Sequence, residues 1–268
     1  MERQIFESMT LCPLDGRYSN VKDAFAQYFS EYALVKYRVY VEIQWLKFLI
    51  ENIESDILKN FDQANMKQIE DIANHFDEEA FAKIKEIESS TRHDVKAVEY
   101  YIGNTLKEMG YDDLISFVHI GCTSEDINNT SYACMIKHGL QDVWLKKANE
   151  VVDAMNKWAI EHSDDAMLAH THGQPATPTT IRKEFKVYAY RFASSIENIK
   201  NIQIKAKFNG ATGNYSAILT AFPNVDWPAQ AKKFVEEYLG LTFNPLTTQI
   251  ESHDYTCHIL DGIRHFNN

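Results

Sequence analysis

Residues 125–163 read EDINNTSYACMIKHGLQDVWLKKANEVVDAMNKWAIEHS, and this stretch decides the fold. Its apolar side chains recur at steps of 3 or 4 residues, which places them on one face of a helix. They are Ile136, Leu140, Trp144, Ala148, Val151, Met155 and Trp158. No helix breaker follows Gly139 until the acidic pair Asp164 and Asp165. The spacing therefore predicts one long helix.

A second apolar stripe of the same spacing covers residues 180–208, and Asn209-Gly210 is the signal expected to end it. Two helices of this length indicate an elongated bundle. Shorter helical patterns precede them at residues 21–52, 66–75, 77–88 and 94–109. No run alternates at period two for long enough to demand a sheet, so we expect an all-α protein. The turn at residues 110–113 predicts a boundary between an N-terminal helical domain, residues 1–110, and a long-helix bundle domain, residues 111–268.

Composition argues against several classes of protein. The chain has 268 residues and a net charge of −11, and no basic cluster is long enough to bind nucleic acid. No apolar run approaches the ~18 residues that span a bilayer, and the first residues lack a basic and apolar leader. We therefore expect a cytoplasmic protein without a membrane segment. The cysteines are widely spaced with no CxxC pair, which predicts reduced core thiols rather than disulfides or structural zinc; they are Cys12, Cys122, Cys134 and Cys257.

Residues 13–18 read PLDGRY and form the first polar segment with functional side chains. The guanidinium fork of Arg17 suits phosphate or carboxylate, and Tyr18 can stack or hydrogen-bond beside it. The segment could therefore clamp a ligand. The alternative is a simple turn, which Asp-Gly predicts without any ligand.

Residues 90–96 read STRHDVK and form the second segment. Asp94 can cap the helix that follows, which is a purely structural role. Helix N-termini also attract anions through free N–H groups and the helix dipole, and Arg92, His93 and Lys96 strengthen that preference. Both a cap and a nucleotide site remain open here.

The longest predicted helix starts with the third segment, which reads HIGCTSED over residues 119–126. Thr123 or Ser124 as N-cap, with acidic residues in the first turn, is ordinary chemistry for a helix start. The two hydroxyls could also hold a substrate oxygen at this N-terminus while His119 approaches from the preceding turn. Both interpretations stay open.

The connection between the two long helices is the fourth segment, HTHGQPATP over residues 170–178. A His-x-His pair can ligate a metal, but the segment offers no Cys, no HExxH and no carboxylate partner, so we expect no metal. Proton transfer is the better interpretation, because the ordinary pKa of histidine lies close to neutrality.

Together these segments resemble the fumarase/aspartase superfamily, which has three signature regions. Residues 123–129, TSEDINN, resemble the first region, and residues 171–177, THGQPAT, resemble the second. The third, a mobile loop reading Gly-Ser-Ser-x-Met-Pro-x-Lys-x-Asn-Pro, has no counterpart in this sequence. Within the superfamily the chain resembles the bacterial adenylosuccinate lyases over essentially all residues after Met9, most specifically at residues 13–18, 93–100, 209–215 and 247–251.

The resemblance implies a homotetrameric carbon–nitrogen lyase of purine nucleotide biosynthesis that needs no cofactor. Such enzymes release fumarate from adenylosuccinate, which gives AMP, and from the succinylated ribotide SAICAR, which gives AICAR. The resemblance implies that His172 is the general acid for the leaving purine nitrogen. It places at the substrate site Arg17, Tyr18, Arg92, His93, Asp94, His119, Thr123, Ser124, Thr171 and Gln249. Arg92 stands where some relatives carry Asn, and Ser252 stands where Pro is common.

The catalytic base of these enzymes is a serine on the third-region loop, and no residue here matches it. We therefore expect this chain to be an N-terminal portion, truncated within the bundle, that is catalytically silent by itself. Long helices with apolar residues over much of their surface also predict self-association. Two alternatives remain: another lyase of the superfamily, such as an argininosuccinate or carboxymuconate relative, and a non-catalytic helical assembly module.

Overall fold

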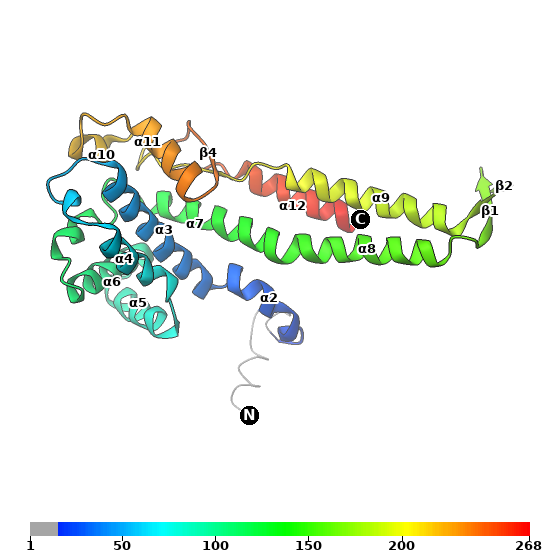
Figure 1. Ribbon diagram of the computed structural model, residues 1–268, viewed down its shortest axis with the longest axis horizontal. Coiled ribbons are helices and arrows are strands. Elements are labelled where there is room, and N and C mark those ends of the chain that lie inside the picture. Colours follow the sequence, from blue (N-terminus) through cyan, green and yellow to red (C-terminus); the bar gives the residue numbers. More distant parts are fainter. Residues whose placement is uncertain (1–15) are drawn as a thin grey trace, which may run out of the picture. The chain divides into compact units, whose positions relative to one another are not determined.

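The computed structural model describes residues 16–268, and helices dominate it (Figure 1). Its strands are few and short, which confirms the predicted all-α class. The chain divides into two compact units. The first holds the residues up to Lys137 together with Ile204–Ser252, and the second holds His138–Gln203 together with His253–Asn268. This division differs from the predicted domain boundary at residue 110, which stays a prediction.

The first unit is organised around one long helix, α3 (Glu31–Asn52), which contacts most of the helices near it in the chain. Ser30 starts α3, because its side chain accepts the backbone N–H of Ala33 at 3.1 Å. The other α-helices wholly inside this unit are α2 (Ser19–Phe29), α4 (Gln63–Asn74), α5 (Glu78–Thr91), α6 (Asp94–Glu108), α10 (Ser216–Ala221) and α11 (Trp227–Lys233). Shorter turns are the 3₁₀ elements η1 (Leu58–Asn60) and η2 (Asp112–Phe117) and the π-helical η4 (Phe234–Tyr238).

Aromatic side chains fill the core beside α3. Trp45 stacks on Phe48 with ring centroids 5.3 Å apart, and it meets Phe208 and Phe234 at 4.6 and 5.1 Å. Trp45, Phe48 and Phe234 are almost completely buried. Aromatic pairs in such tilted and stacked arrangements add about 0.5–1.5 kcal/mol each beyond the area they bury. This cluster fixes α3 as the frame from which two buried charged residues project.

The segment after the second long helix is not helical, so the predicted helix over residues 180–208 is wrong beyond Lys200. The helix α9 (Ile181–Lys200) ends there, and β3 (Lys205–Ala206) pairs in parallel with β4 (Thr242–Phe243). The backbone N–H of Lys207 then donates to the side chain of Asn129 at 2.9 Å. Partners far away in the sequence have replaced the i−4 carbonyls that a helix would have used.

The second unit consists of long helices joined by a hairpin. The first of these helices, α7 (Ser124–Gly139), begins in the first unit and continues here through the π-helical turn η3 (Leu140–Trp144) into α8 (Leu145–Glu161), which confirms the predicted long helix with a π turn inside it. Next come β1 (Ala166–Thr171) and β2 (Gln174–Thr180), an antiparallel pair that the sequence did not indicate. Two helices, α9 and α12 (Asp254–Asn267), complete the unit.

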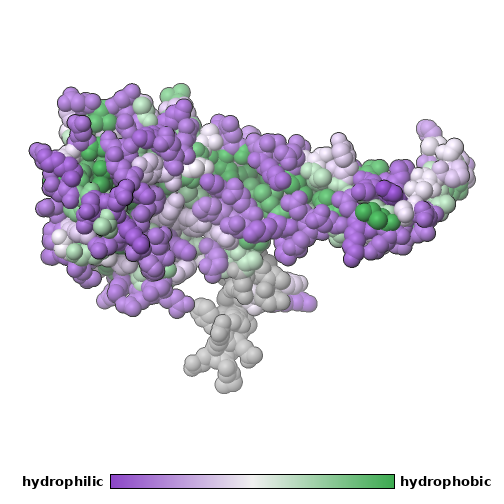
Figure 2. Space-filling view, viewed as in Figure 1, coloured by the Kyte–Doolittle hydropathy of each residue, from purple (hydrophilic) through white to green (hydrophobic). Residues whose placement is uncertain are grey.

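A small apolar core holds these helices together. Ala148, Val152 and Ile196 are buried, and the ring of Phe266 on α12 packs against Trp144 and Phe192 at centroid distances of 5.1 and 4.8 Å. Many other apolar side chains of these helices remain exposed, among them Val151, Ile160, Val187, Tyr188, Tyr190 and Leu260. Figure 2 shows apolar patches interrupting the hydrophilic surface along these helices. The expectation of self-association stays a prediction.

Candidate active site

Arg38 on α3 connects the starts of two other helices in the first unit. Its Nη2 lies 2.6 Å from Asp94, the first residue of α6, and its Nε donates to Asn128 in the first turns of α7 at 2.9 Å. Arg38 is itself buried. Both helix N-termini present the positive end of a helix dipole. Arg38 therefore places two anion-attracting helix ends beside each other.

Asp94 is held by Arg38 rather than acting as the helix cap that the sequence suggested. The N-cap is His93, whose Nδ1 accepts the backbone N–H of Lys96 at 3.2 Å. Burial by itself raises the pKa of Asp94, but the charge of Arg38 and a backbone hydrogen bond from Val95 outweigh it, so the net pKa is lowered. Asp94 is therefore a carboxylate at neutral pH, and Arg38 is its counter-charge.

His119 lies in the turn before α7, between carboxylates of two helices. Its Nδ1 is 2.5 Å from Oε1 of Glu42 on α3, and its Nε2 is 3.7 Å from Oε1 of Glu99 on α6. Burial by itself lowers the pKa of His119, but the hydrogen bond and charge of Glu42, helped by the charge of Glu99, raise it above its ordinary value. The indole of Trp45 anchors the same turn by donating to the carbonyl of Ile120 at 3.2 Å.

A fully buried ion pair supports the start of α7. Asp126 and Lys207 have no exposed side-chain surface, and Nζ of Lys207 lies 2.8 Å from Oδ1 of Asp126. The same carboxylate accepts backbone N–H groups from Thr123 at 2.9 Å and from Asn209 and Gly210, both at 3.1 Å. Asp126 thereby fixes the turn that carries Thr123 and Ser124, two of the predicted substrate-binding residues.

The segments at residues 209–215 and 247–251, far apart in the sequence, lie side by side. The side-chain amide of Asn209 donates to the hydroxyl of Thr247 at 2.8 Å. Gly213 has φ +77°, and a Cβ there would come within 2.1 Å of the carbonyl oxygen of Thr247. Close approach of the two backbones thus requires glycine. Gln249, the predicted substrate contact, follows this approach with its side chain exposed.

Arg17 and Tyr18 precede α2 at the beginning of the described chain. Both are exposed, and the guanidinium of Arg17 lies 5.5 Å from the centre of the Tyr18 ring. The rest of the predicted clamp, Pro13, Leu14 and Asp15, lies outside the described residues, as does Cys12. This cation–π contact keeps the charge of Arg17 next to the ring of Tyr18, as a clamp for an anionic ligand with an aromatic base would require.

Thr171 and His172 belong to the second unit, where they form the tip of the β1–β2 hairpin. Thr171 pairs with Gln174, so the loop between the strands consists of His172 and Gly173 alone. These two residues have φ values of 52° and 72°, the combination of a type I′ turn. Thr171, His172 and Gly173 are all exposed. The predicted acid and Thr171 therefore belong to a different unit from the other predicted binding residues.

Backbone strain coincides with the predicted site. In the described part of the chain the non-glycine residues with positive φ are Arg92, His119, His172, Tyr215 and His253. Three of these are predicted site residues, and Tyr215 ends the segment 209–215. Left-handed non-glycine residues cost on the order of 1–3 kcal/mol and concentrate at functional sites.

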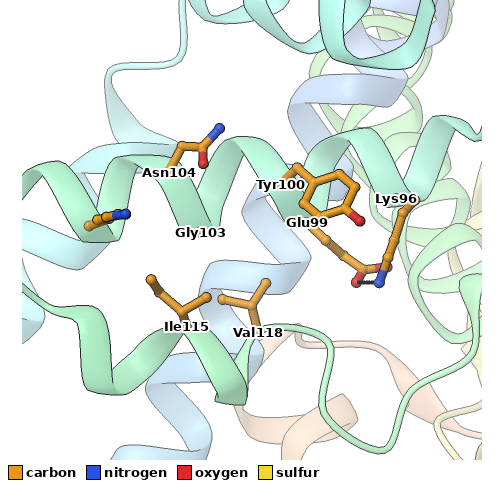
Figure 3. A pocket seen from close by; sticks show the side chains of 8 residues that line it. Lys96, Glu99, Tyr100, Gly103, Asn104, Ile115 and Val118 are labelled. Carbon is orange, nitrogen blue, oxygen red and sulfur yellow. Dashed lines mark hydrogen bonds and ion pairs between the residues drawn. The ribbon is translucent and has the colours of Figure 1, made fainter. Parts of the chain in front are cut away.

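An open pocket of about 440 Å³ lies along α6 and is lined by Glu99, the residue that faces His119 (Figure 3). Lys96 and Glu99 form an ion pair at 2.6 Å at one end of it, and Asn104 and Ile115 line the remainder. Within residues 16–268 no group of three or more His, Cys, Asp or Glu side chains is arranged to hold a metal ion. Nor does that part of the chain contain a helix long and apolar enough to cross a membrane.

Four residues that support the site were not predicted from the sequence: Arg38, Glu42, Glu99 and Lys207. Arg38 and Glu42 are spaced by one helical turn, and Lys207 follows an apolar stripe, so their charges looked like ordinary solvated positions. A charged residue recurring on the apolar face of a helix was the available signal for Arg38 and Glu42.

A family profile described as "Lyase" matches residues 16–268. This chain belongs to that lyase family. Among curated proteins it is similar to the enzymes named adenylosuccinate lyase from Vibrio cholerae and Escherichia coli, with 44% and 41% identity over 256 residues. Each alignment covers 95% of this chain and 56% of the relative. The chain thus spans about half the length of the curated relatives it matches.

Solved structures of low sequence identity share the fold. A fumarate lyase from Mesorhizobium superposes with a TM-score of 0.66 at 18% identity, covering 90% of this chain and 53% of that chain. A β-carboxy-cis,cis-muconate cycloisomerase from Acinetobacter calcoaceticus gives a TM-score of 0.65, also at 18% identity, covering 89% and 53%. At this identity the likeness concerns the fold alone.

Proposed function

We propose that this chain provides the nucleotide-binding part and the general acid of an adenylosuccinate lyase. The observation that carries the proposal is the bridge made by Arg38 between the N-termini of α6 and α7. Two such helix ends suit the phosphate and carboxylate groups of a succinylated purine nucleotide. The similarity to enzymes of that name supports the same substrate class.

Each predicted residue receives a role in this proposal. His93, Asp94, Thr123 and Ser124 bind the substrate at the two helix starts, with His119 in the turn between them. Other binding residues are Arg17, Tyr18, Arg92, Thr171 and Gln249. His172 protonates the departing purine nitrogen as fumarate is released. The products are AMP from adenylosuccinate and AICAR from SAICAR.

The reaction also needs a base that removes the proton from the carbon beside a carboxylate. No residue of this sequence matches the family's serine loop, so a chain of these 268 residues is proposed to bind nucleotide without turnover. We further propose that the active form is a cytoplasmic homotetramer without a cofactor. Exposed apolar residues on α8, α9 and α12 support the self-association.

Calorimetric titration with AMP tests the binding role. Replacing Ser124 with Ala removes a hydroxyl at the start of α7 and should weaken AMP binding about tenfold, on the scale of ~1.4 kcal/mol for a hydrogen bond to a charged group. The matched control is Ser194→Ala, which removes a serine hydroxyl from α9 in the other unit and should leave AMP affinity unchanged. Absence of AMP binding by the unmodified chain would favour the non-catalytic assembly module instead.

A further inference from the structure

Glu42 is a carboxylate buried in a helix whose other buried residues are almost all apolar. Its side chain has no exposed surface, and it lies on α3 between Val41 and Ile43, which are also fully buried. One of its oxygens, Oε2, has no hydrogen-bond partner within the described residues. Burying a charged oxygen without a partner costs folding free energy, so a purely structural role would favour an apolar side chain here.

Among the described residues, the hydrogen-bond partner of Glu42 is His119. Oε1 of Glu42 lies 2.5 Å from Nδ1 of His119, so the carboxyl group and the imidazole share a close hydrogen bond. His119 itself has φ 59°, so its backbone is held in a strained conformation that directs the ring toward α3. This geometry fixes the ring orientation and the atom that faces Glu42.

Among residues 16–268, the charged groups that face His119 belong to α3 or α6. They are Glu42, Glu99 at 3.7 Å from Nε2, and Lys96, which pairs with Glu99 at 2.6 Å. Three protonation arrangements are open to a close His–Glu pair: imidazolium with carboxylate, a neutral imidazole whose Nδ1–H donates to the carboxylate, and a neutral imidazole that accepts from a protonated carboxyl group. The second carboxylate, Glu99 near Nε2, favours the imidazolium, and the effect of its charge exceeds that of Lys96.

We propose that Glu42 is a positioning residue that keeps His119 doubly protonated, with Nδ1–H bound to the carboxylate and Nε2–H directed toward α6. An imidazolium is the form of histidine that donates to a phosphate or carboxylate oxygen from both nitrogens. The role of His119 as a donor to substrate rests on the proposed function, whereas the effect of Glu42 on the protonation of His119 does not.

Nitrogen-15 NMR of the histidine rings tests the proposal in the 268-residue chain itself. A His119→Gln variant assigns the His119 signal among the ten histidines. In the unmodified chain the titration midpoint of His119 should lie above the ordinary value of about 6.5, with both ring nitrogens protonated below that midpoint. In Glu42→Gln the midpoint should fall by about one pH unit or more, a tenfold loss of proton affinity, because burial remains and the main counter-charge is gone.

The matched control is Glu70→Gln. Glu70 lies on α4 and pairs with Lys47 of α3 at 2.5 Å, so its replacement removes a carboxylate that contacts the same helix as Glu42 without touching His119. The control should leave the His119 midpoint where it is. An unchanged midpoint in Glu42→Gln, or a midpoint at or below about 6.5 in the unmodified chain, would overturn the proposal. If Glu42→Gln does not fold, the protonation pattern of the unmodified chain decides alone.

The AMP titration is a separate measurement, so the two ideas fail separately. AMP binding with a neutral His119 would remove the role of Glu42 and leave the proposed function in place. A protonated His119 without AMP binding would do the opposite.

Discussion

Replacing Lys207 with Met should destabilise the first unit more than any exposed ion-pair substitution in the chain. The methionine fills a similar volume without the charge, so the main change is electrostatic. Asp126 would keep its backbone hydrogen bonds from Thr123, Asn209 and Gly210 but would lose its counter-charge in a fully buried position. The carbonyl of Gly210 would also lose the Lys207 ammonium that donates to it at 2.9 Å.

The expected magnitude follows from these two losses. Removing one partner of a buried ion pair costs about 3–5 kcal/mol. The remaining backbone donors stabilise the carboxylate, which places Asp126 toward the lower end, and the unsatisfied carbonyl adds about 1 kcal/mol. These losses total about 4 kcal/mol, so at about 2–4 °C per kcal/mol for a unit of this size the melting temperature of the first unit should fall by roughly 8–16 °C.

Tryptophan fluorescence during urea and thermal unfolding measures the effect, since Trp45 and Trp227 are both buried in the first unit. The control is Lys147→Met, which breaks an exposed pair with Glu150 and should change stability by about 0.5 kcal/mol or less. A Lys207→Met protein as stable as this control would refute the reasoning. The double variant Asp126→Asn with Lys207→Met gives a second test. A loss of stability equal to the sum of the losses in the two single variants would also refute the reasoning, because the effects of two coupled residues are not additive.

Three further outcomes are expected. In a protein that also carries the third signature region, His172→Ala should lower turnover by about 10²-fold with a smaller change in nucleotide affinity, and near-normal steady-state rates would assign the acid role elsewhere. Gly213→Ala should lower the unfolding midpoint more than Gly110→Ala. Both glycines have positive φ, but only at position 213 would the added Cβ clash with Thr247. Equal losses in the two variants would count against the close approach of the two backbones. His119→Gln should cost more stability at pH 6 than at pH 9, because the pKa of His119 is raised in the folded state. A raised folded-state pKa contributes stability that is complete below the unfolded-state pKa and is lost as pH rises through the folded-state pKa. Urea titrations at the two pH values measure the cost, and a cost independent of pH would contradict this prediction.

Helix positions were predictable where one apolar face decides them. The pattern at residues 94–109 predicted α6 (Asp94–Glu108) to within one residue, and that at residues 66–75 gave α4 with an earlier start. The pattern failed over residues 201–208, where Ile202 continues the helical spacing. Pairing with β4, and the hydrogen bond that the backbone N–H of Lys207 donates to the side chain of Asn129, decide that segment, and neither partner is visible from local spacing.

The hairpin could not be predicted for a different reason. Nearly all its side chains are exposed or half-buried, so its strands lack the alternation of apolar and polar residues that marks a strand packed on a core. Its turn depends on positive φ at His172, a conformation that glycine signals and histidine does not. The sequence indicated that His172 is chemically important but gave no indication of the hairpin that carries it.

The candidate site was predictable in its contacts with substrate and not in its supports. Polar segments that stand out from a helical pattern drew attention to His93, His119 and Thr123. Their counter-charges, Arg38 and Glu42, sit inside a helix and look like solvated positions until the fold buries them. Pairing across segments 50 or more residues apart requires the tertiary structure.

Binding and proton transfer have different structural support in this chain, and this separates the expected kinetic effects under the proposed function. The binding residues of the first unit are held by buried pairs, Arg38 with Asp94 and Glu42 with His119. His172 instead stands at the tip of an exposed two-stranded hairpin, and such hairpins are marginally stable by themselves. A general acid must come within about 2.6–3.2 Å of the atom it protonates, so contacts formed around the hairpin during assembly and substrate binding must set its position. Substitutions in the buried pairs should therefore act mainly on substrate affinity, and substitutions that alter the hairpin turn should act mainly on turnover.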